Sequence, residues 1–533
     1  MSSFADCVFR NGQVVTLDAD SRVCRAVAVK GDRILRVGAD EAMRDVAGPK
    51  TRVVDLKGRS LVPGFIDAHI HMDMGVQDLG LTLRYPDVRS LEDIYGLVRD
   101  AVAKTPPGQI IRGWGYDQNR LTEKRHPTRR ELDAIAPDHP VALIRTCEHM
   151  SVHNSRSLAL AGVREDEGNP PGGEICRDAD GRMNGLMKET ANVRMMRAMP
   201  FSEEEFYQGL LTSDTRLCRY GITSVHEVGV KPHHLRLFQK GIREGAIHVR
   251  VYACPYSDTL GYVRDFMKSG VLTGFGDDRL RIGALKTMLD GSSSGPSSAM
   301  REPYASDPAS QGILYMDQAT LDGFVDEAHR LGYQVSAHAV GDAAVEQMVS
   351  AIEKALRANP RADHRHRIEH CALVDDDLMD RIRKAGIVPI GQPVFLYEFG
   401  DAYRVHYGDE RANRMFRGRA FQERGIVAAA GSDSPVTSAD PLLGVHVAVN
   451  RATQSGQALS PNERLSVMEA LRLYTVNAAY AAFEEKMKGS IEPGKLADLT
   501  VLSEPLLDVP ADEIKNVRAE ATMIGGSFVF GDA

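Results

Sequence analysis

Hydrophobic and polar positions follow two different patterns along the chain. Short alternating runs between residues 7 and 57, such as CVFRNG, QVVTLD and TRVVDLKG, predict β-strands joined by tight turns. The segments ADLTVLSEPLL and RAEATMIGGSFVFG near the other end have the same pattern. Because the two ends of a domain often lie close together, we expect residues 1–60 and 485–533 to form one small β-sandwich domain.

Strands alternate with helices in the central part, residues 61–484. Segments with helical periodicity separate most of the apolar runs, for example at 317–330, 342–357 and 375–385. The predicted strands are 61–71, 221–229, 248–255, 280–286, 333–342, 365–370, 386–393 and 425–433. Eight is the number of strands that closes a (β/α)8 TIM barrel, so the pattern predicts an α/β fold of this type.

One interval between strands is much longer than the others. Approximately residues 75–215 separate the first predicted strand from the second, and they contain a helical pattern at 90–104 and the strand-like runs IIRGWGYD and PVALIRT. Ser202 and Glu205 have the spacing of a capping box, which predicts that a further helix begins there. We interpret this interval as a large insertion at the mouth of the barrel.

Composition narrows the class of protein. Of the 533 residues, 43% are hydrophobic and 26% are charged, as in ordinary globular domains. A net charge of −8 argues against a nucleic-acid-binding surface, which needs a basic face. We see no apolar run long enough to span a membrane and no secretory signal, and the seven cysteines are scattered. We therefore expect a cytoplasmic protein with reduced thiols and no membrane partner.

Side chains that suit a metal site end five of the eight predicted strands. His69 and His71 lie two residues apart on the first strand, so both imidazoles point to the same side. The fourth, fifth, sixth and eighth strands end at Lys286, His338, His370 and Asp433. Each residue alone has a simpler role, as a core histidine, a turn aspartate or a lysine that reaches solvent. Together, at the end of a barrel that carries active sites, they predict a metal centre.

These segments and several others resemble the amidohydrolase superfamily. Within it the chain is most similar to the amidohydrolase-3 (YtcJ-like) group, which includes N-substituted formamide deformylases. The segments that carry the resemblance are LVPGFIDAHIH, GWGYDQN, HNSRSLALAGV, GITSVHE, LKTMLDGS, SAHAVGD, HRIEH, GSDSPV, DPLLGVHVAV and GSIEPGKLADLTVL. They are spread from about residue 60 to 502, so the resemblance covers nearly the whole chain.

The resemblance implies a hydrolase of an amide, formamide or N-acyl bond with two divalent ions, zinc being the expected metal. His69, His71 and Asp433 would bind one ion, and His338 and His370 the other. Lys286 resembles the family's bridging lysine, which carbon dioxide carboxylates on its side-chain nitrogen. A desolvated lysine beside cations loses its proton readily, as this modification requires. Asp433 would then be the catalytic residue, taking a proton from water and passing it to the leaving nitrogen.

Residues that bind a small-molecule substrate are harder to assign. By resemblance, the insertion folds over the barrel mouth and lines the pocket with Trp114, Tyr116, Asp117, His149 and Asn154. Trp114 and Tyr116 can equally form the insertion's own core. Arg301 and Tyr304 follow the Gly/Ser-rich run and are candidates to contact a substrate carboxylate, although Arg301 can also be simply exposed.

Two further interpretations stay open. One is a deaminase of a cyclic amidine or aromatic base, which would use a single metal and no carboxylated lysine, so Lys286 argues against it. The other is a non-catalytic binding or scaffold relative, against which the complete set of expected ligands argues. His226 and Glu227, at the end of the second strand, are predicted to support ligands rather than to bind metal. A homodimer is the default expectation for the oligomeric state.

Overall fold

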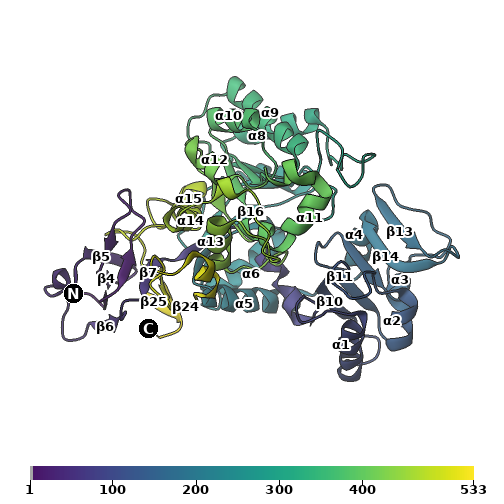
Figure 1. Cartoon of the computed structure of the whole chain (residues 1–533), viewed down its shortest axis with the longest axis horizontal. Coiled ribbons are helices and arrows are strands. Elements are labelled where there is room, and N and C mark those ends of the chain that lie inside the picture. Colours follow the sequence, from purple (N-terminus) through teal and green to yellow (C-terminus); the bar gives the residue numbers. More distant parts are fainter. Residues whose placement is uncertain (1–3, 533) are drawn as a thin grey trace. The chain divides into compact units, whose positions relative to one another are not determined.

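A computed structural model describes residues 4–532, and the chain divides into two compact units. One unit comprises the described residues up to Asp73 and those from Ser213 onward, and the other is Met74–Thr212 (Figure 1). The second unit includes most of the segment 75–215, and the interpretation of that segment as an insertion at the barrel mouth stays a prediction. The division of the first unit into a terminal domain and a barrel domain stays a prediction.

The chain ends form two neighbouring sheets in the first unit, and the second of them contains strands from both ends. One sheet has the order β5-β4-β1-β6, and the other has the order β25-β24-β23-β7-β2-β3. Their strands are β1 (Cys7–Arg10), β2 (Gln13–Val15), β3 (Val23–Cys24), β4 (Ala26–Lys30), β5 (Arg33–Gly38), β6 (Arg52–Asp55), β7 (Ser60–Pro63), β23 (Leu499–Leu502), β24 (Ala519–Ile524) and β25 (Ser527–Phe530). Phe9, Val27 and Leu56 form one buried cluster with Leu499 and Met523, so residues from both ends share a core.

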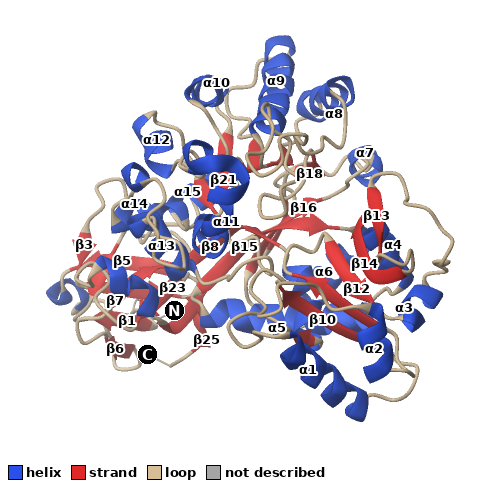
Figure 2. Cartoon of the chain, turned by 45° about the vertical axis from the view of Figure 1, so that its right-hand side comes forward, coloured by secondary structure: helices blue, strands red, loops and turns tan. Residues whose placement is uncertain are grey.

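The barrel strands follow one another in chain order. Two runs of parallel strands, β8-β15-β16-β17 and β18-β19-β20-β21-β22, meet where Tyr256 bridges to Lys286 and where β22 lies beside β8. The strands are β8 (Phe65–Ile70), β15 (Ile222–Val230), β16 (Arg250–Pro255), β17 (Leu280–Ile282), β18 (Leu285–Met288), β19 (Val335–Ala339), β20 (Arg367–His370), β21 (Val388–Gly391) and β22 (Ala429–Ala430). Because β17 and β18 are two pieces of the fourth strand, the barrel has eight strand positions. Figure 2 shows β15 between β8 and β16.

The first predicted strand is wrong as one continuous element. Residues 61–71 separate into β7, which pairs with β2 and β23 of the terminal sheet, and β8, which pairs with β15 of the barrel. The apolar run crosses from one sheet to the other at Gly64, and hydrophobicity alone does not mark that change. His69 is in β8, and His71 follows its end.

Side chains cap the amino ends of two helices that were predicted from the sequence. Asp317 accepts a hydrogen bond from Thr320 N at the start of α8 (Gln318–Arg330), and Asp375 accepts one from Leu378 N at the start of α10 (Asp376–Ala385). With α9 (Asp342–Ala358), they confirm the three predicted helices. The other helices of this unit are α6 (Pro232–Arg243), α7 (Gly261–Lys268), α11 (Pro393–Ala412), α12 (Gly418–Glu423), α13 (Pro441–Asn450), α14 (Val467–Leu473) and α15 (Val476–Ala481).

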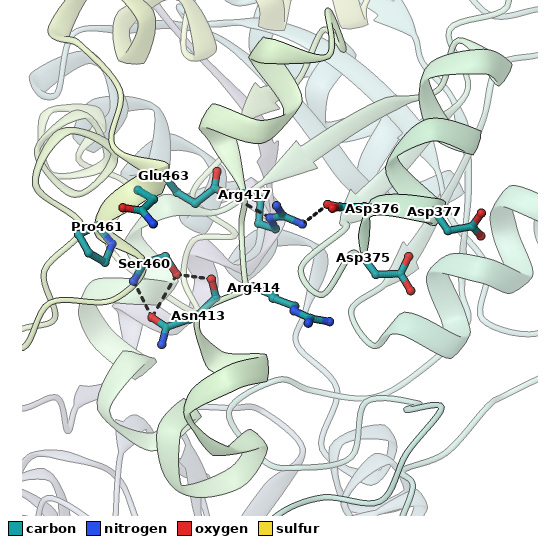
Figure 3. Close-up of a pocket in the computed structure, with 10 residues that line it drawn as sticks. Asp375, Asp376, Asp377, Asn413, Arg414, Arg417, Ser460, Pro461 and Glu463 are labelled. Atoms are coloured by element: carbon teal, nitrogen blue, oxygen red, sulfur yellow. Dashed lines mark hydrogen bonds and ion pairs between the residues drawn. The ribbon is translucent and has the colours of Figure 1, made fainter.

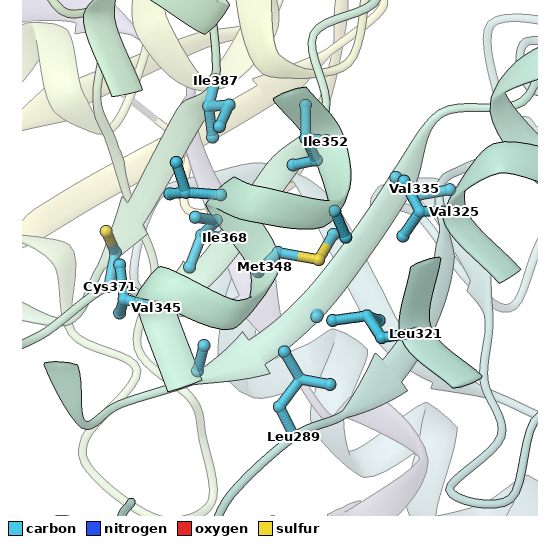
Figure 4. Packing of buried hydrophobic residues seen from close by; sticks show 14 of the residues in the cluster. Leu289, Leu321, Val325, Val335, Val345, Met348, Ile352, Ile368, Cys371 and Ile387 are labelled. Atoms are coloured by element: carbon cyan, nitrogen blue, oxygen red, sulfur yellow. The ribbon is translucent and has the colours of Figure 1, made fainter. Parts of the chain in front are cut away.

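A large hydrophobic cluster joins helices α8, α9 and α10 to the barrel strands. Val325 of α8 and Met348 of α9 pack against Val335 of β19 and Ile368 of β20, all of them buried (Figure 4). The burial of such side chains contributes about 1.5–3 kcal/mol each, relative to leaving them in water. This packing holds β19 and β20, and therefore the histidines at their carboxyl ends, on a rigid support.

The second unit has a six-stranded sheet of its own, with the order β13-β14-β12-β11-β10-β9. Its elements are β9 (Leu81–Thr82), α1 (Leu91–Lys104), β10 (Ile111–Tyr116), α2 (Arg129–Ile135), β11 (Val141–Arg145), β12 (Met150–His153), α3 (Ser155–Leu160), β13 (Gly173–Arg177), β14 (Met183–Glu189) and α4 (Thr190–Ala198). The helix α5 (Glu203–Arg219) begins at the predicted capping box, where Ser202 and Glu205 exchange hydrogen bonds. No helix among residues 4–532 has the length and apolarity to cross a membrane.

Candidate metal centre

The predicted ligands gather at the carboxyl ends of the barrel strands. His69 lies in β8, Lys286 in β18, His338 in β19 and His370 at the end of β20, and Asp433 follows β22. The structure therefore brings residues that are more than 360 positions apart in the sequence to one end of the barrel.

Asp433 lies between the two histidines of the HxH motif. Its Oδ1 is 3.1 Å from His69 Nε2 and 3.2 Å from His71 Nε2. One donor atom from each of the three residues lies within 4.8 Å of the others. Burial opposes the charge of Asp433, but His69, His71 and His370 outweigh it and hold the pKa of this carboxyl well below its usual range. Two imidazole nitrogens and a carboxylate oxygen are a donor set that zinc and similar ions bind.

The other two histidines continue the same group of rings. The ring centroids of His69 and His370 are 4.8 Å apart, and those of His370 and His338 are 4.4 Å apart. Burial lowers the pKa of His370 to about 3 and that of His338 well below its usual value. Both imidazoles are therefore neutral at pH 7, and a neutral imidazole keeps the lone pair that a metal ligand needs.

An unusual backbone conformation directs His370 toward this group. Alternation along β20 would place Glu369 and His370 on opposite faces. His370 instead adopts φ 68°, and its neighbour Cys371 adopts φ 45°, in the left-handed region that residues other than glycine rarely occupy. Asp433 also has a positive φ, 56°. Strained residues of this kind concentrate at functional sites, where the surrounding structure holds them.

Hydrogen bonds connect the first strand to the loop that carries Asp433. Asp433 N donates to His69 O at 2.8 Å, and His71 N donates to Ser434 O at 2.9 Å. The buried Asp67 accepts hydrogen bonds from Ser432 N and Oγ. At Gly431 a Cβ atom would lie 2.4 Å from His69 N, so only glycine permits this close approach.

Glu369 is a site residue that sequence analysis missed. Its Oε2 lies 2.6 Å from His69 Nδ1, and the buried Arg367 donates to Oε1 at 2.8 Å. Although burial favours the neutral acid, Arg367 and His69 hold the pKa of Glu369 well below its usual range. The carboxylate therefore fixes the His69 ring with Nε2 facing Asp433. The alternation R-I-E in HRIEH gives an Arg–Glu pair on one strand face, but it does not reveal the contact with His69.

Gln392 and Gly291 orient the other two histidines. His370 Nδ1 lies 2.8 Å from Gln392 Oε1, and His338 Nε2 lies 3.1 Å from Gly291 O. Asp290 Oδ1 is 3.4 Å from His338 Nε2, but the two oxygens of this buried carboxylate already accept hydrogen bonds from the backbone of Ala299, Val340 and Gly341. These orienting groups were not predicted either, because they follow β18 and β21 rather than the strands of the histidines.

Lys286 is almost completely buried, with 2% of its surface exposed. Burial lowers the pKa of its ammonium group, against the charges of Glu369 and Asp433, which raise it. Its Nζ lies 5.8 Å from the centroid of the Tyr256 ring. The side chain is thus in an environment that favours the neutral, nucleophilic amine more than water does.

The predicted substrate residues of the insertion have partners within the second unit. Trp114 and Tyr116 are buried in hydrophobic clusters on the sheet, and Tyr116 Oη is 2.9 Å from His126 Nδ1. The remaining contacts are Asp117 with Arg145, His149 with Glu189, and the Asn154 side chain with the backbone of Ser157 at the start of α3. A part in substrate binding stays a prediction for all five.

Arg301 and Tyr304 belong to the first unit and are also engaged. Arg301 forms ion pairs with Glu346 and Asp375 at 2.9 and 2.6 Å, and Tyr304 is buried with its hydroxyl donating to Ser298 O. Arg301 is therefore not simply exposed, and its charge is already neutralised by two carboxylates. Contact of either residue with a substrate carboxylate also stays a prediction.

A separate polar pocket of about 870 Å³ lies in the same unit (Figure 3). Asp376 and Glu463 face Arg417 there, and Ser460 contacts Asn413. None of the predicted site residues lines it. Arg417 is paired with two carboxylates of the lining, whereas Arg414 and Asp375 are paired with Glu410 and Arg301 outside it.

Comparisons with known proteins agree with this geometry. The model of the family described as "Amidohydrolase family" matches residues 52–530. The chain belongs to the amidohydrolase family. An N-substituted formamide deformylase of Arthrobacter pascens is 28% identical, over 99% of this chain and 98% of that protein. The protein LONG AFTER FAR-RED 3 of Arabidopsis thaliana is 30% identical, over 99% and 92% of the two chains.

Among solved structures, a metal-dependent hydrolase from Pyrococcus horikoshii OT3 superposes with a TM-score of 0.77. It is 27% identical, and the match covers 95% of this chain and 99% of that one. The resemblance found in the sequence is thus confirmed. The amidohydrolase described here is a metal-dependent hydrolase that acts on carbon–nitrogen bonds, and its metal centre is to be sought at the residues gathered at the barrel end.

Proposed function

We propose that this amidohydrolase cleaves an amide, formamide or N-acyl bond at a centre of two divalent ions, with zinc as the metal. His69, His71 and Asp433 would bind one ion, and His338 and His370 the other. The observation that carries this proposal is the contiguous group of four imidazole rings around one buried carboxylate, beside a buried lysine. We further propose that the two terminal sheets form a β-sandwich domain and that the enzyme is cytoplasmic.

Lys286 would complete the centre as a carbamate. In its neutral form the Nζ lone pair forms a bond to the carbon of carbon dioxide, one C=O electron pair moves onto oxygen, and the nitrogen loses a proton. The carbamate would carry one negative charge and two carboxylate oxygens, which are donors that divalent ions bind. The lowered pKa of Lys286, caused first by its burial, favours the amine form that this step requires.

The roles of the protein groups follow from their positions. Bound divalent ions supply a water of lowered pKa and polarise a carbonyl oxygen. Asp433 lies between the ligand histidines and would take the proton from the attacking water and deliver it to the leaving nitrogen. Glu369 keeps His69 in the orientation that leaves Nε2 for the metal. His338 and His370 remain neutral donors because burial keeps their pKa values low.

An N-substituted formamide is the first substrate to test, because the relative from Arthrobacter pascens is named for deformylation of such compounds. Zinc-loaded enzyme would be assayed against N-substituted formamides, N-acyl amino acids, cyclic amides and carboxylic esters. We expect hydrolysis in one of the carbon–nitrogen classes and a loss of that activity when a chelator removes the metal. Equal activity of metal-free and metal-loaded enzyme would refute the proposal.

The deaminase alternative predicts a different outcome in the same experiment. It requires ammonia release from a cyclic amidine or aromatic base, one ion per chain and no dependence on Lys286. A Lys286→Met variant with unchanged metal content and activity would favour it.

A further inference from the structure

The two histidines of the HxH motif differ in how they are supported. His69 is 1% exposed, and Glu369 accepts from its Nδ1. The side chain of His71 is 29% exposed, so packing alone does not fix its ring. A histidine that binds metal through one nitrogen usually donates the N–H of the other to a carboxylate or a carbonyl. His71 therefore needs a hydrogen-bond acceptor for its Nδ1–H, as Glu369 is for His69.

Two buried carboxylates lie on the far side of the His71 ring. One donor atom each from His71, Asp73 and Glu227 lies within 4.8 Å of the other two. The three groups surround the space beside Gly229: a Cβ atom placed there would be 3.0 Å from His71 Nδ1, 3.2 Å from Glu227 Oε1 and 3.7 Å from Asp73 Oδ1. Glycine at this position thus leaves room for the three polar atoms to approach one another.

Both carboxylates are held in place. Glu227 lies in β15 and is fully buried, and it accepts hydrogen bonds from Gly229 N at 3.0 Å and from Met72 N, the residue next to His71. Asp73 directs Oδ2 to His234 Nδ1 of α6 at 3.0 Å. Its Oδ1 is buried and has no hydrogen-bond partner in the described part of the chain. An oriented acceptor of this kind is costly to leave unpaired.

We infer that Glu227 and Asp73 position His71, by accepting its Nδ1–H so that Nε2 faces Asp433. Glu227 would also hold the backbone beside His71, because its other carboxylate oxygen accepts a hydrogen bond from Met72 N. The inference rests on the proposed function, since it concerns a ligand of the proposed centre. It assigns the HxH motif a matched pair of supports, Glu369 for His69 and the Glu227–Asp73 pair for His71.

The test compares metal binding by four variants and the wild type. Glu227→Gln and Asp73→Asn keep the size of each side chain and remove its charge. Gly229→Ala keeps both carboxylates and fills the space between them and the ring. Asp498→Asn is the control: Asp498 is a buried carboxylate that accepts from Arg250, the residue that begins β16 at the opposite end of the barrel strands.

Zinc affinity would be measured by competition with a chelator, and the visible spectrum would be recorded for the cobalt-loaded proteins. We expect about 10–100-fold weaker zinc binding and a changed cobalt spectrum for Glu227→Gln, with a smaller loss for Asp73→Asn and for Gly229→Ala. The Asp498→Asn control is expected to lose thermal stability but to keep wild-type zinc affinity and the wild-type spectrum. A merely structural role of Glu227 would give the control's result.

Unchanged zinc affinity and cobalt spectrum in both Glu227→Gln and Asp73→Asn would overturn the inference. If Glu227→Gln does not fold, the test rests on Asp73→Asn and Gly229→Ala. Wild-type zinc affinity in both of these variants would also overturn the inference. A wild-type chain that binds no zinc overturns the proposed function together with this inference. Tight wild-type binding with unaffected variants overturns the inference alone.

Discussion

The two halves of the proposed centre are built differently. The half formed by His69, His71 and Asp433 contains its own anion, and the carboxylate of Glu369 orients one of its histidines. The half formed by His338 and His370 is oriented by an amide and a backbone carbonyl. Among residues 4–532, neither of these two histidines belongs to a set of three such donors within 4.8 Å.

This difference indicates that the second half needs a further ligand with a negative charge. Two neutral imidazoles leave a divalent ion short of charge and of ligands. Lys286 is the nearby residue that can provide both, but only after it has become a carbamate. The first half is therefore expected to bind metal without modification, and the second half only with it.

Removal of the anion of the first half should have the greatest effect. In Asp433→Asn the side chain keeps its size but loses its charge and its ability to accept a proton. We expect kcat/KM to fall by roughly 10²–10⁴-fold on whichever substrate the screen identifies. Steady-state kinetics and metal analysis check this, with Asp498→Asn as the buried-carboxylate control. A variant within tenfold of wild-type activity would show that Asp433 does not carry the proton.

Removal of the lysine should affect the second half most, because that half has no other anion in the proposed centre. Lys286→Met retains much of the side-chain length but cannot form a carbamate. We expect the metal content to fall from two ions to one per chain, and the activity by roughly 10²-fold or more, because one source of charge stabilisation is lost. Metal analysis by mass spectrometry measures the stoichiometry. Two ions in Lys286→Met would mean that the second half needs no anion from this residue.

The residues that orient the ligand histidines should also differ between the two halves in their effect on zinc affinity, and these effects should be smaller. Glu369→Gln removes the charge that holds His69, and zinc affinity of the first half should weaken about 10–100-fold. Gln392→Ala removes a neutral acceptor from His370, and we expect a smaller loss, confined to the second ion. Chelator competition on both variants measures which of them loses more zinc affinity. Equal losses would indicate that charge in the orienting group does not distinguish the two halves.

A third group of histidines, at the amino ends of β19 and β20, provides a reference for structural roles. His366 Nδ1 accepts from Val335 N, and His364 Nδ1 accepts from His366 N, so backbone donors fix both rings in neutral forms. His329 Nδ1 lies 2.8 Å from His366 Nε2, which donates to it. Unlike the rings at the other end of these strands, these have no carboxylate between them.

Protonation of these histidines should make the free energy of unfolding depend on pH, whether or not metal is bound. Burial lowers the pKa of His364 to about 4, below the value of about 6.5 in an unfolded chain. The neutral ring therefore contributes stability that is complete above pH 6.5 and is lost as the pH falls toward 4. We expect a loss on the order of 1–2 kcal/mol between pH 7 and pH 5, measured by urea unfolding with chelator present. His364→Asn should reduce this loss, and an unchanged pH dependence would contradict the assignment.

Much of the barrel was predictable because its signals are local. Hydrophobic periodicity located the strands and helices, and the caps at Ser202, Asp317 and Asp375 mark where helices begin. Placing His69, His338 and His370 together needed only the rule that parallel strands present their carboxyl ends at one side of a barrel. The division of 61–71 between two sheets was missed, since strand pairing is not encoded in local hydrophobicity.

The supporting residues were beyond sequence reasoning for a physical reason. Glu369, Gln392 and Asp67 act through contacts between strands, and those distances depend on which strands are neighbours and on their register. His370 reaches the centre through a positive φ, which breaks the strand alternation from which its direction would be predicted. In the insertion, Asp117 and His149 find local charged partners that sequence spacing did not suggest.

The proposed centre depends on Lys286 to supply the anion that its second half lacks. The most direct measurement is a high-resolution crystal structure of the zinc-loaded enzyme grown with bicarbonate, with anomalous scattering to locate zinc. We predict two ions, one at His69, His71 and Asp433 and one at His338 and His370, joined by a carbamate on Lys286 Nζ. A single ion beside an unmodified Lys286 would contradict the account.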